Sequence, residues 1–157
     1  GDHMTAYPTL ATAVDGIYTA IGTALQAQIT TGGKLANLAT LTRGDSTGIK
    51  PPLPALFYYG GRISQPERNT LAGTREVWKM PVYLVSVARG ESGSAGATTA
   101  NNYALNGRAT LLASSGLGLD YVRKIESDSV VLAAPHKEDR SIFGAVALVA
   151  IEFTASR

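Results

Sequence analysis

The stretch REVWKMPVYLVSVARGESGSAGATTANNY, Arg75 to Tyr103, decides the fold class of this chain. Its first half predicts a β-strand from Arg75 to Ala88. After Met80 both faces of that strand are largely apolar, which is typical of a strand covered on both sides. Pro81 lies inside this run and cannot donate a hydrogen bond to a neighbouring strand. We therefore expect Pro81 at a sheet edge, at a strand start or at a bulge.

The second half of the stretch turns to glycine and serine and then to a helix. Gly90 to Thr99 predicts a flexible loop. Thr98 or Thr99 is expected to cap the following helix, which runs to about Ser114. Small residues on one face of this helix would let it lie close on a sheet. That face is formed by Ala100, Tyr103, Ala104, Gly107 and Leu111.

A second amphipathic helix is predicted near the N-terminus. Apolar residues recur there at steps of three and four, and Pro8 suits the first turn of a helix. Thr30 to Gly33 supplies the stop signal. A long loop follows at about 30–54, with room for a short turn or strand around Leu35 to Leu41. The apolar face of this helix consists of Leu10, Val14, Ile17, Ile21, Leu25 and Ile29.

Further strands complete the predicted fold. Residues 55–61 predict a short strand, and 121–127 and 129–134 predict two short strands around a turn at Ser127 and Asp128. Ile142 to Ala155 predicts a long strand in a central position. Strands that follow one another directly favour antiparallel pairing. The sequence therefore predicts an α+β fold, with a mostly antiparallel sheet of about four to five strands and two helices packed on it.

Length and composition limit the function classes. Gly1 to His3 is expected to be a cloning scar before a native Met4, and residues 4–157 form one α+β domain. The net charge is +2 with no block of like charge, so we expect no sequence-specific nucleic acid as partner. The chain has no cysteine, which excludes disulfides and thiolate chemistry. No apolar run has the length of a membrane span, so we expect no membrane partner.

No motif predicts chemistry. His136, Glu138 and Asp139 could form a metal or acid/base cluster, but their spacing fits no metal-ligand pattern and favours a solvated charged turn. Arg43 to Asp45 matches a tripeptide that serves as an adhesion signal in secreted proteins. A match of three residues is too short to predict an adhesion function. The glycine-rich segments GLGLDY and GESGSAG lack the residues that complete a nucleotide fingerprint, a phosphate loop or a nucleophile elbow. We therefore expect no catalytic residues, no metal and no cofactor.

The polar loops are instead the expected contact regions of a binding or assembly unit. These loops span 30–54, 62–75, 90–98 and 135–141. The candidate residues for a contact with a neighbouring subunit or with a tube are Arg62, Glu67, Arg68, Arg75, Trp78, Arg89, Glu91, Lys137 and Arg140.

The order of features resembles one known family. An amphipathic N-terminal helix precedes PALFYYGG at 54–61, VYLVSVARG at 82–90, GLGLD at 116–120 and AVALVAIEF at 145–153. This order is similar to that of the small tail-terminator proteins of Mu-like contractile-tailed phages and, more distantly, of lambda-type minor tail and tail-terminator proteins. The resemblance covers most of Met4 to Thr154. Segment 30–54 matches no pattern of the family.

The resemblance implies a phage or prophage structural protein without enzymatic activity. Such a subunit forms a hexameric ring that caps the tail tube and joins it to the head-completion proteins. Its partners would be further copies of itself, the tail tube protein and a head-completion or connector protein. Its place would be the virion tail, assembled in the bacterial cytoplasm. A ring needs a heterologous interface whose rotation closes, which sheet edges can supply. We expect loops 62–75 and 90–98 to become ordered only on assembly.

Other functions stay open at this point. A head–tail connector, a neck protein or a tail-tube subunit would share the same features. A small enzyme with an unrecognised site and an adhesion module using Arg43 to Asp45 are the alternatives from other classes.

Overall fold

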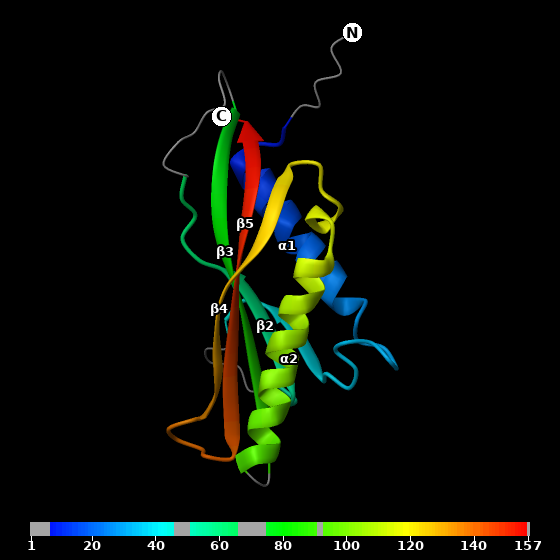
Figure 1. Cartoon of the computed structure of the whole chain (residues 1–157), viewed down its shortest axis with the longest axis vertical. Helices are drawn as coiled ribbons and strands as arrows, with labels where there is room; N and C mark the ends of the chain where they lie inside the picture. The colour runs from blue at the N-terminus through cyan, green and yellow to red at the C-terminus, as the bar shows by residue number, and fades with distance from the viewer. Residues whose placement is uncertain (1–6, 46–50, 66–74, 91–92, 157) are drawn as a thin grey trace.

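The structure is a computed structural model that describes residues 7–45, 51–65, 75–90 and 93–156. It consists of a sheet and a helical layer, which Figure 1 shows side by side. The five strands lie in the order β1-β2-β3-β5-β4. The predicted α+β fold is therefore confirmed. The elements are α1 (Leu10–Gln26), β1 (Thr40–Arg43), β2 (Ala55–Gly60), β3 (Arg75–Arg89), α2 (Gly93–Ala113), the 3₁₀ turn η1 (Gly116–Gly118), β4 (Val122–Pro135) and β5 (Ile142–Ser156).

The centre of the sheet is an antiparallel pair of long strands. β3 and β5 each have 15 residues and pair from Arg75 opposite Ser156 to Arg89 opposite Ile142. β2 pairs antiparallel with β3, and β4 pairs antiparallel with β5. β1 is parallel to β2 and lies at one edge, where it begins near the end of the predicted segment around Leu35 to Leu41. The expected central position of the last strand is confirmed.

Pro81 breaks one ladder of β3 and leaves the other intact. β3 starts at Arg75 and its register with β5 is continuous through Pro81, so the expected strand start and the expected bulge in β3 are both wrong. On the other side, the Pro81 carbonyl accepts a hydrogen bond from the Gly61 amide at 2.8 Å. In an antiparallel pair a residue's donor and acceptor point the same way. The missing N–H of Pro81 therefore faces β2, whose regular pairing ends at Gly60 opposite Val82.

Helix α1 follows the predicted pattern. The Thr9 side chain caps its N-terminus by accepting a hydrogen bond from the Thr12 amide, so Pro8 precedes the helix instead of lying in its first turn. Ile17, Ile21 and Leu25 have no exposed surface. The helix ends at Gln26, before the predicted stop. The amphipathic stripe was therefore sufficient to find the helix but placed its end too late.

Helix α2 begins inside the predicted flexible loop. It starts at Gly93, so the prediction of a loop to Thr99 is wrong for residues 93–99, and residues 91–92 lie outside the described residues. Thr99 is an interior helical residue whose hydroxyl donates to the Ala95 carbonyl at 3.0 Å. The reason is tertiary packing: a Cβ at Gly96 would lie 2.5 Å from the Phe143 ring. Because Gly96 has no side chain, the helix can pack closely on Phe143 of the sheet, and this packing stabilises a helical turn that glycine and serine alone disfavour.

The two predicted strands around Ser127 and Asp128 are one strand. β4 runs through both residues and pairs with β5 from Val122 to Pro135, with register shifts at three places. One shift lies between Ser127 and Ser129, where the turn was expected. A β-bulge accommodates one extra residue without ending the strand, and edge strands often carry such bulges. Serine and aspartate here signal a bulge and not a turn.

Candidate subunit interface

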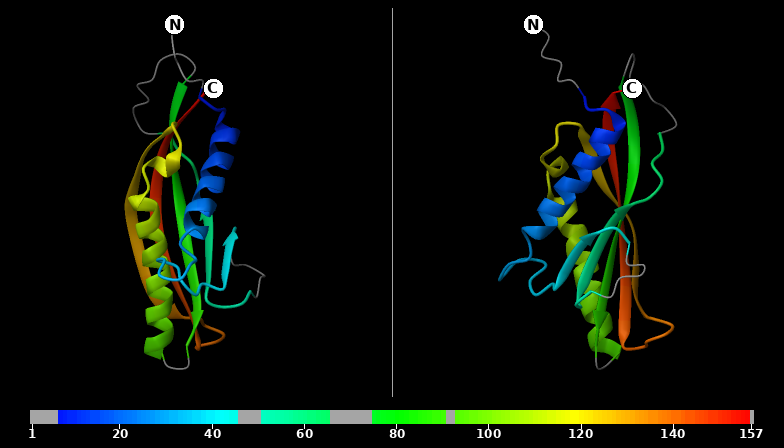
Figure 2. Two further views of the ribbon diagram at one scale, coloured as in Figure 1. Left: turned by 90° about the vertical axis from the view of Figure 1, so that its right-hand side faces the viewer. Right: turned by 180° about the vertical axis from the view of Figure 1, so that it is seen from behind.

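Both helices cover the same face of the sheet. Figure 2 (left) looks onto the helices with the strands behind them, and its right panel shows both helices on one side of the sheet. The side chains of β3 that face the helices are buried from Met80 to Ala88, including Val82 and Leu84. We call the opposite side the helix-free face. The expectation that both faces of β3 are covered alike is corrected, because the alternate side chains from Pro81 to Val87 are partly exposed.

An apolar patch occupies the middle of the helix-free face. Val85 pairs with Val146, and Val146 pairs with Val131, so one row crosses β3, β5 and β4. Tyr83 and Leu148 pair in the next row. The Tyr83 ring stacks on Tyr59 at 5.2 Å between centroids. The apolar patch is formed by Tyr83, Val85, Val87, Val131, Val146 and Leu148.

Edge strand β4 carries the most exposed part of the patch. Val131 is 63% exposed and the next residue, Leu132, is 62% exposed. They are the exposed large hydrophobic side chains among the described residues. Leu132 lies in the register shift between Val131 and Ala134. The sequence contained this signal as the apolar run Val130 to Ala134. It was missed because the segment was interpreted as a separate, paired strand.

Charged side chains of both signs border one end of the patch. On the helix-free face, Lys79 pairs with Glu152 and Lys124 pairs with Glu152 from the other side. Arg123 also forms an ion pair with Glu152 at 3.5 Å. A hydrogen bond from the Lys124 ammonium to the Glu126 carboxylate, 2.9 Å long, raises the pKa of Lys124 and lowers that of Glu126. We call these five residues the β4 charge cluster.

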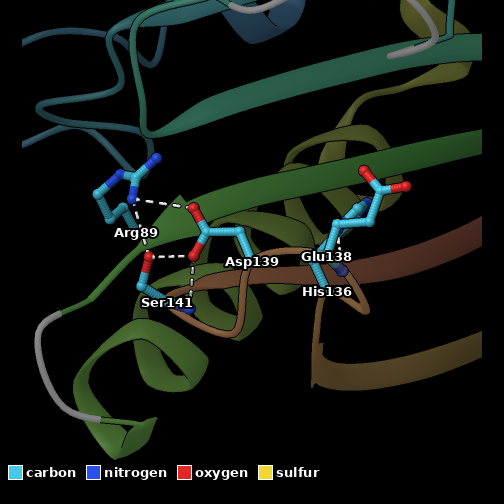
Figure 3. Close-up of polar contacts among 5 residues, drawn as sticks. All are labelled: Arg89, His136, Glu138, Asp139 and Ser141. Atoms are coloured by element: carbon cyan, nitrogen blue, oxygen red, sulfur yellow. Dashed lines mark hydrogen bonds and ion pairs between the residues drawn. The ribbon is translucent and has the colours of Figure 1, made fainter.

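A polar network closes the opposite end of the sheet, at the turn between β4 and β5 (Figure 3). The Arg89 guanidinium donates to the Ser141 hydroxyl at 2.8 Å and lies 3.3 Å from the Asp139 carboxylate. Asp139 accepts hydrogen bonds from the hydroxyl and the amide of Ser141 at 2.6 and 3.0 Å. These bonds, followed by the charge of Arg89, lower the pKa of Asp139. The network ties the end of β3 to the turn.

The same turn carries the residues considered as a metal or acid/base cluster. His136 and Glu138 are exposed, and the His136 Nδ1 accepts a hydrogen bond from the Glu138 amide at 3.2 Å. Asp139 is directed to Arg89 and Ser141 instead (Figure 3). Among the described residues, no group of three or more histidine, aspartate and glutamate side chains is placed to hold a metal ion. The arrangement is that of a solvated, internally bonded turn.

The predicted interface residues divide between the two ends of the sheet. Arg89, Lys137 and Arg140 lie together at the β4–β5 turn, and all three are exposed. Arg75 lies at the opposite end of β3, about 45 Å away along a strand of this length. These residues therefore belong to no single site.

The remaining predicted interface residues have varied surroundings. The Arg75 guanidinium lies 4.8 Å from the centre of the Tyr7 ring. Arg62 is exposed just after β2, and Trp78 packs against the core. Glu67, Arg68 and Glu91 lie outside the described residues.

Arg43, the first residue of the adhesion tripeptide, has contacts within the fold. Arg43 ends β1, and its guanidinium lies 3.9 Å from the centre of the Tyr18 ring. It also forms an ion pair with Asp15 at 3.4 Å. Both contacts direct the arginine toward α1.

A hollow of about 260 Å³ lies between α2 and the segment after α1. The polar groups that line it hold the segment in place. The Tyr103 hydroxyl donates to the Ala36 carbonyl at 2.7 Å, and the Asn106 amide donates to the Lys34 carbonyl at 3.0 Å. Tyr103 and Asn106, two of the polar residues that line the hollow, therefore hold the segment after α1 against α2.

Comparison with known proteins assigns this chain to no family. No protein-family model matches the chain, and no curated protein matches it. Neither helix in the described ranges has the length and apolar content needed to cross a membrane.

Proposed function

We propose that this protein is a phage tail terminator, a non-enzymatic assembly subunit. It forms a ring that caps the tail tube and joins it to the head-completion proteins. The proposal is supported by the sequence resemblance, which rests on the order of the N-terminal helix and the quoted motifs along the chain. The α+β architecture agrees with what that resemblance implies, and fold alone does not define function.

The apolar patch is the observation that carries the proposal. Tyr83, Val85, Val146 and Leu148 lie across the two central strands and remain partly exposed, and Val131 extends the patch to the sheet edge. Contiguous exposed apolar surface of this kind marks an interaction site. In the part of the chain that the structure describes, no group of three or more histidine, aspartate and glutamate side chains could hold a metal ion. The surface therefore favours association over catalysis.

The sheet edges supply a route to a closed ring. β1 and β4 are the two outer strands, and they differ in length and sequence. A contact between β4 of one subunit and β1 of the next would be heterologous, as a ring requires. Strand addition at such an edge uses backbone hydrogen bonds. The bulges and charges of β4 would restrict pairing with unrelated strands.

Electron microscopy with purified tail tubes tests the proposal. The protein should form rings and bind one end of each tube, and its addition should stop further tube growth. Labelling the protein on intact virions separates a terminator at the tube end from a connector or neck protein nearer the head. A protein that neither forms rings nor binds tube ends would contradict the proposal.

A further inference from the structure

We infer that helix α2 protects the apolar part of the β4 edge from strand addition, through a hydrogen bond from the β4 backbone to Asn101. We call residues 130–134 the apolar edge segment. The protection acts between copies of this chain, whose strands would otherwise pair edge to edge at this segment. The inference does not rest on the proposed function, because it concerns contacts that the free subunit avoids.

The apolar edge segment has the features of an aggregation-prone strand. β4 is an outer strand, and the described part of the sheet gives it a partner strand on one side only. Residues 130–134 have the sequence VVLAA, without charge or proline, and Val131 and Leu132 are 63% and 62% exposed. An exposed outer strand of this composition pairs readily with a strand of another molecule. The chain therefore needs protection at this segment.

Asn101 provides this protection at the Ala133 amide. The register of β4 with β5 passes from Val131 to Ala134, so Ala133 lies in a bulge outside the regular ladder. Its N–H donates to the Asn101 side-chain oxygen at 2.7 Å, in a partly buried position. A strand added beside β4 needs alternate backbone donors and acceptors along the edge. Because Asn101 already uses the donor at Ala133, pairing across 130–134 would have to displace it.

A second side chain of α2 holds β4 at another bulge. Arg108 donates two hydrogen bonds to the Ser127 hydroxyl, at 2.8 and 3.1 Å, beside the register shift between Ser127 and Ser129. Asn101 and Arg108 lie about two turns apart on α2. A bulge bends its strand and increases the local twist. The two contacts therefore hold an irregular edge, which hinders regular pairing with another strand.

The charged part of β4 has a different kind of protection. Residues 123–128 contain Arg123, Lys124, Glu126 and Asp128, and all four are exposed. Charges on an edge strand disfavour most pairings and favour a strand of complementary charge. The contact with Asn101 therefore lies where charged side chains are missing from β4. In the proposed ring, the charged part would stay available to β1 of the next subunit.

Substitutions of Asn101 test the inference. Asn101→Leu keeps a side chain of similar size and removes the acceptor, whereas Asn101→Asp keeps an acceptor oxygen. Asn102→Leu, exposed on the same helix, is the control for added apolar surface. Tyr18→Phe is the control for lost stability, because it also removes the acceptor of one backbone amide, that of Gly60.

We expect only Asn101→Leu to increase self-association in sedimentation velocity and to increase thioflavin T binding. The association constant should rise about fivefold, which corresponds to the net contribution of one backbone hydrogen bond. In dilute protein, hydrogen exchange of the Ala133 amide should become faster in Asn101→Leu and stay at the wild-type rate in Asn101→Asp. Adding Leu132→Lys to Asn101→Leu should remove the increase, because a charge interrupts the apolar edge segment.

The outcomes separate this inference from the proposed function. Unchanged self-association of Asn101→Leu overturns the inference, as does an equal increase in Tyr18→Phe or Asn102→Leu. An increase that persists after Leu132→Lys is added overturns it too. Even if Asn101→Leu does not fold, a wild-type Ala133 amide that exchanges as fast as in an unfolded chain overturns it. The expected effects at Asn101, together with no rings and no binding to tail tubes, support the inference and contradict the proposed function.

Discussion

Gly96 provides the sharpest test of how the tertiary structure specifies α2. A Cβ on Gly96 would lie 2.5 and 2.8 Å from two carbons of the buried Phe143 ring and 3.1 Å from the Gly90 amide nitrogen. Ordinary carbon contacts begin near 3.5 Å, so the ring must move. Overpacking of this kind costs about 1–3 kcal/mol, and replacing glycine by alanine in a helix gains at most about 1 kcal/mol. We expect Gly96→Ala to lower the free energy of unfolding by about 1–2 kcal/mol.

Gly93→Ala is the matched control for this substitution. Gly93 begins the same helix, and its Cβ would lie 3.8 Å from the Phe143 ring, an ordinary contact. The free energy of unfolding should therefore change by less than about 0.5 kcal/mol. The double variant Gly96→Ala with Phe143→Leu should be more stable than the sum of the single effects implies, because the smaller side chain relieves the overlap.

Urea denaturation at one fixed protein concentration measures these differences. The single tryptophan, Trp78, packs against the core and provides a fluorescence signal for unfolding. For a domain of this length, each kcal/mol corresponds to about 2–4 °C in Tm. A Gly96→Ala variant as stable as wild type would refute the reasoning. That result would mean that the helix does not depend on close contact with Phe143.

Three further predictions concern single groups. Ser86 is buried with its hydroxyl unbonded among the described residues, so Ser86→Ala should raise the free energy of unfolding by about 1 kcal/mol in urea titrations; a loss would contradict this. The Gly60 amide donates to the Tyr18 hydroxyl at 2.6 Å, so Tyr18→Phe should cost about 0.5–1.5 kcal/mol in the same assay. The lowered pKa of Asp139 stabilises the fold above its ordinary pKa of about 4, and that contribution is lost as pH falls through the lower folded value. Asp139→Asn should therefore reduce the dependence of Tm on pH in this acid range, and an unchanged dependence would argue against the network.

The predictability of the fold varied with the type of signal. The stripe of Ile17, Ile21 and Leu25 identified α1, and the apolar runs identified β3 and β5, because burial of these side chains stabilises the elements directly. The start of α2 was missed because its first turn depends on Phe143, a residue about 50 positions away in the chain. β4 was divided in two because a bulge and a turn share polar residues.

The candidate site was less predictable than the fold. The charged residues Arg89, Lys137 and Arg140 were named from the sequence, and the structure brings them to one end of the sheet. The apolar patch was not expected, because an apolar side chain under a helix and one on an open face look alike in a sequence. Only the tertiary structure separates these two cases.

The sequence by itself determined that this chain has an α+β fold, two amphipathic or small-faced helices and a long central strand. These features depend on local periodicity, which the side chains along each element define. The tertiary structure decided which face of β3 the helices cover, where Pro81 interrupts pairing and how far α2 extends toward β3. The physical reason is that burial, strand pairing and close contact depend on residues distant in the chain, such as Val82 and Gly60 or Gly96 and Phe143.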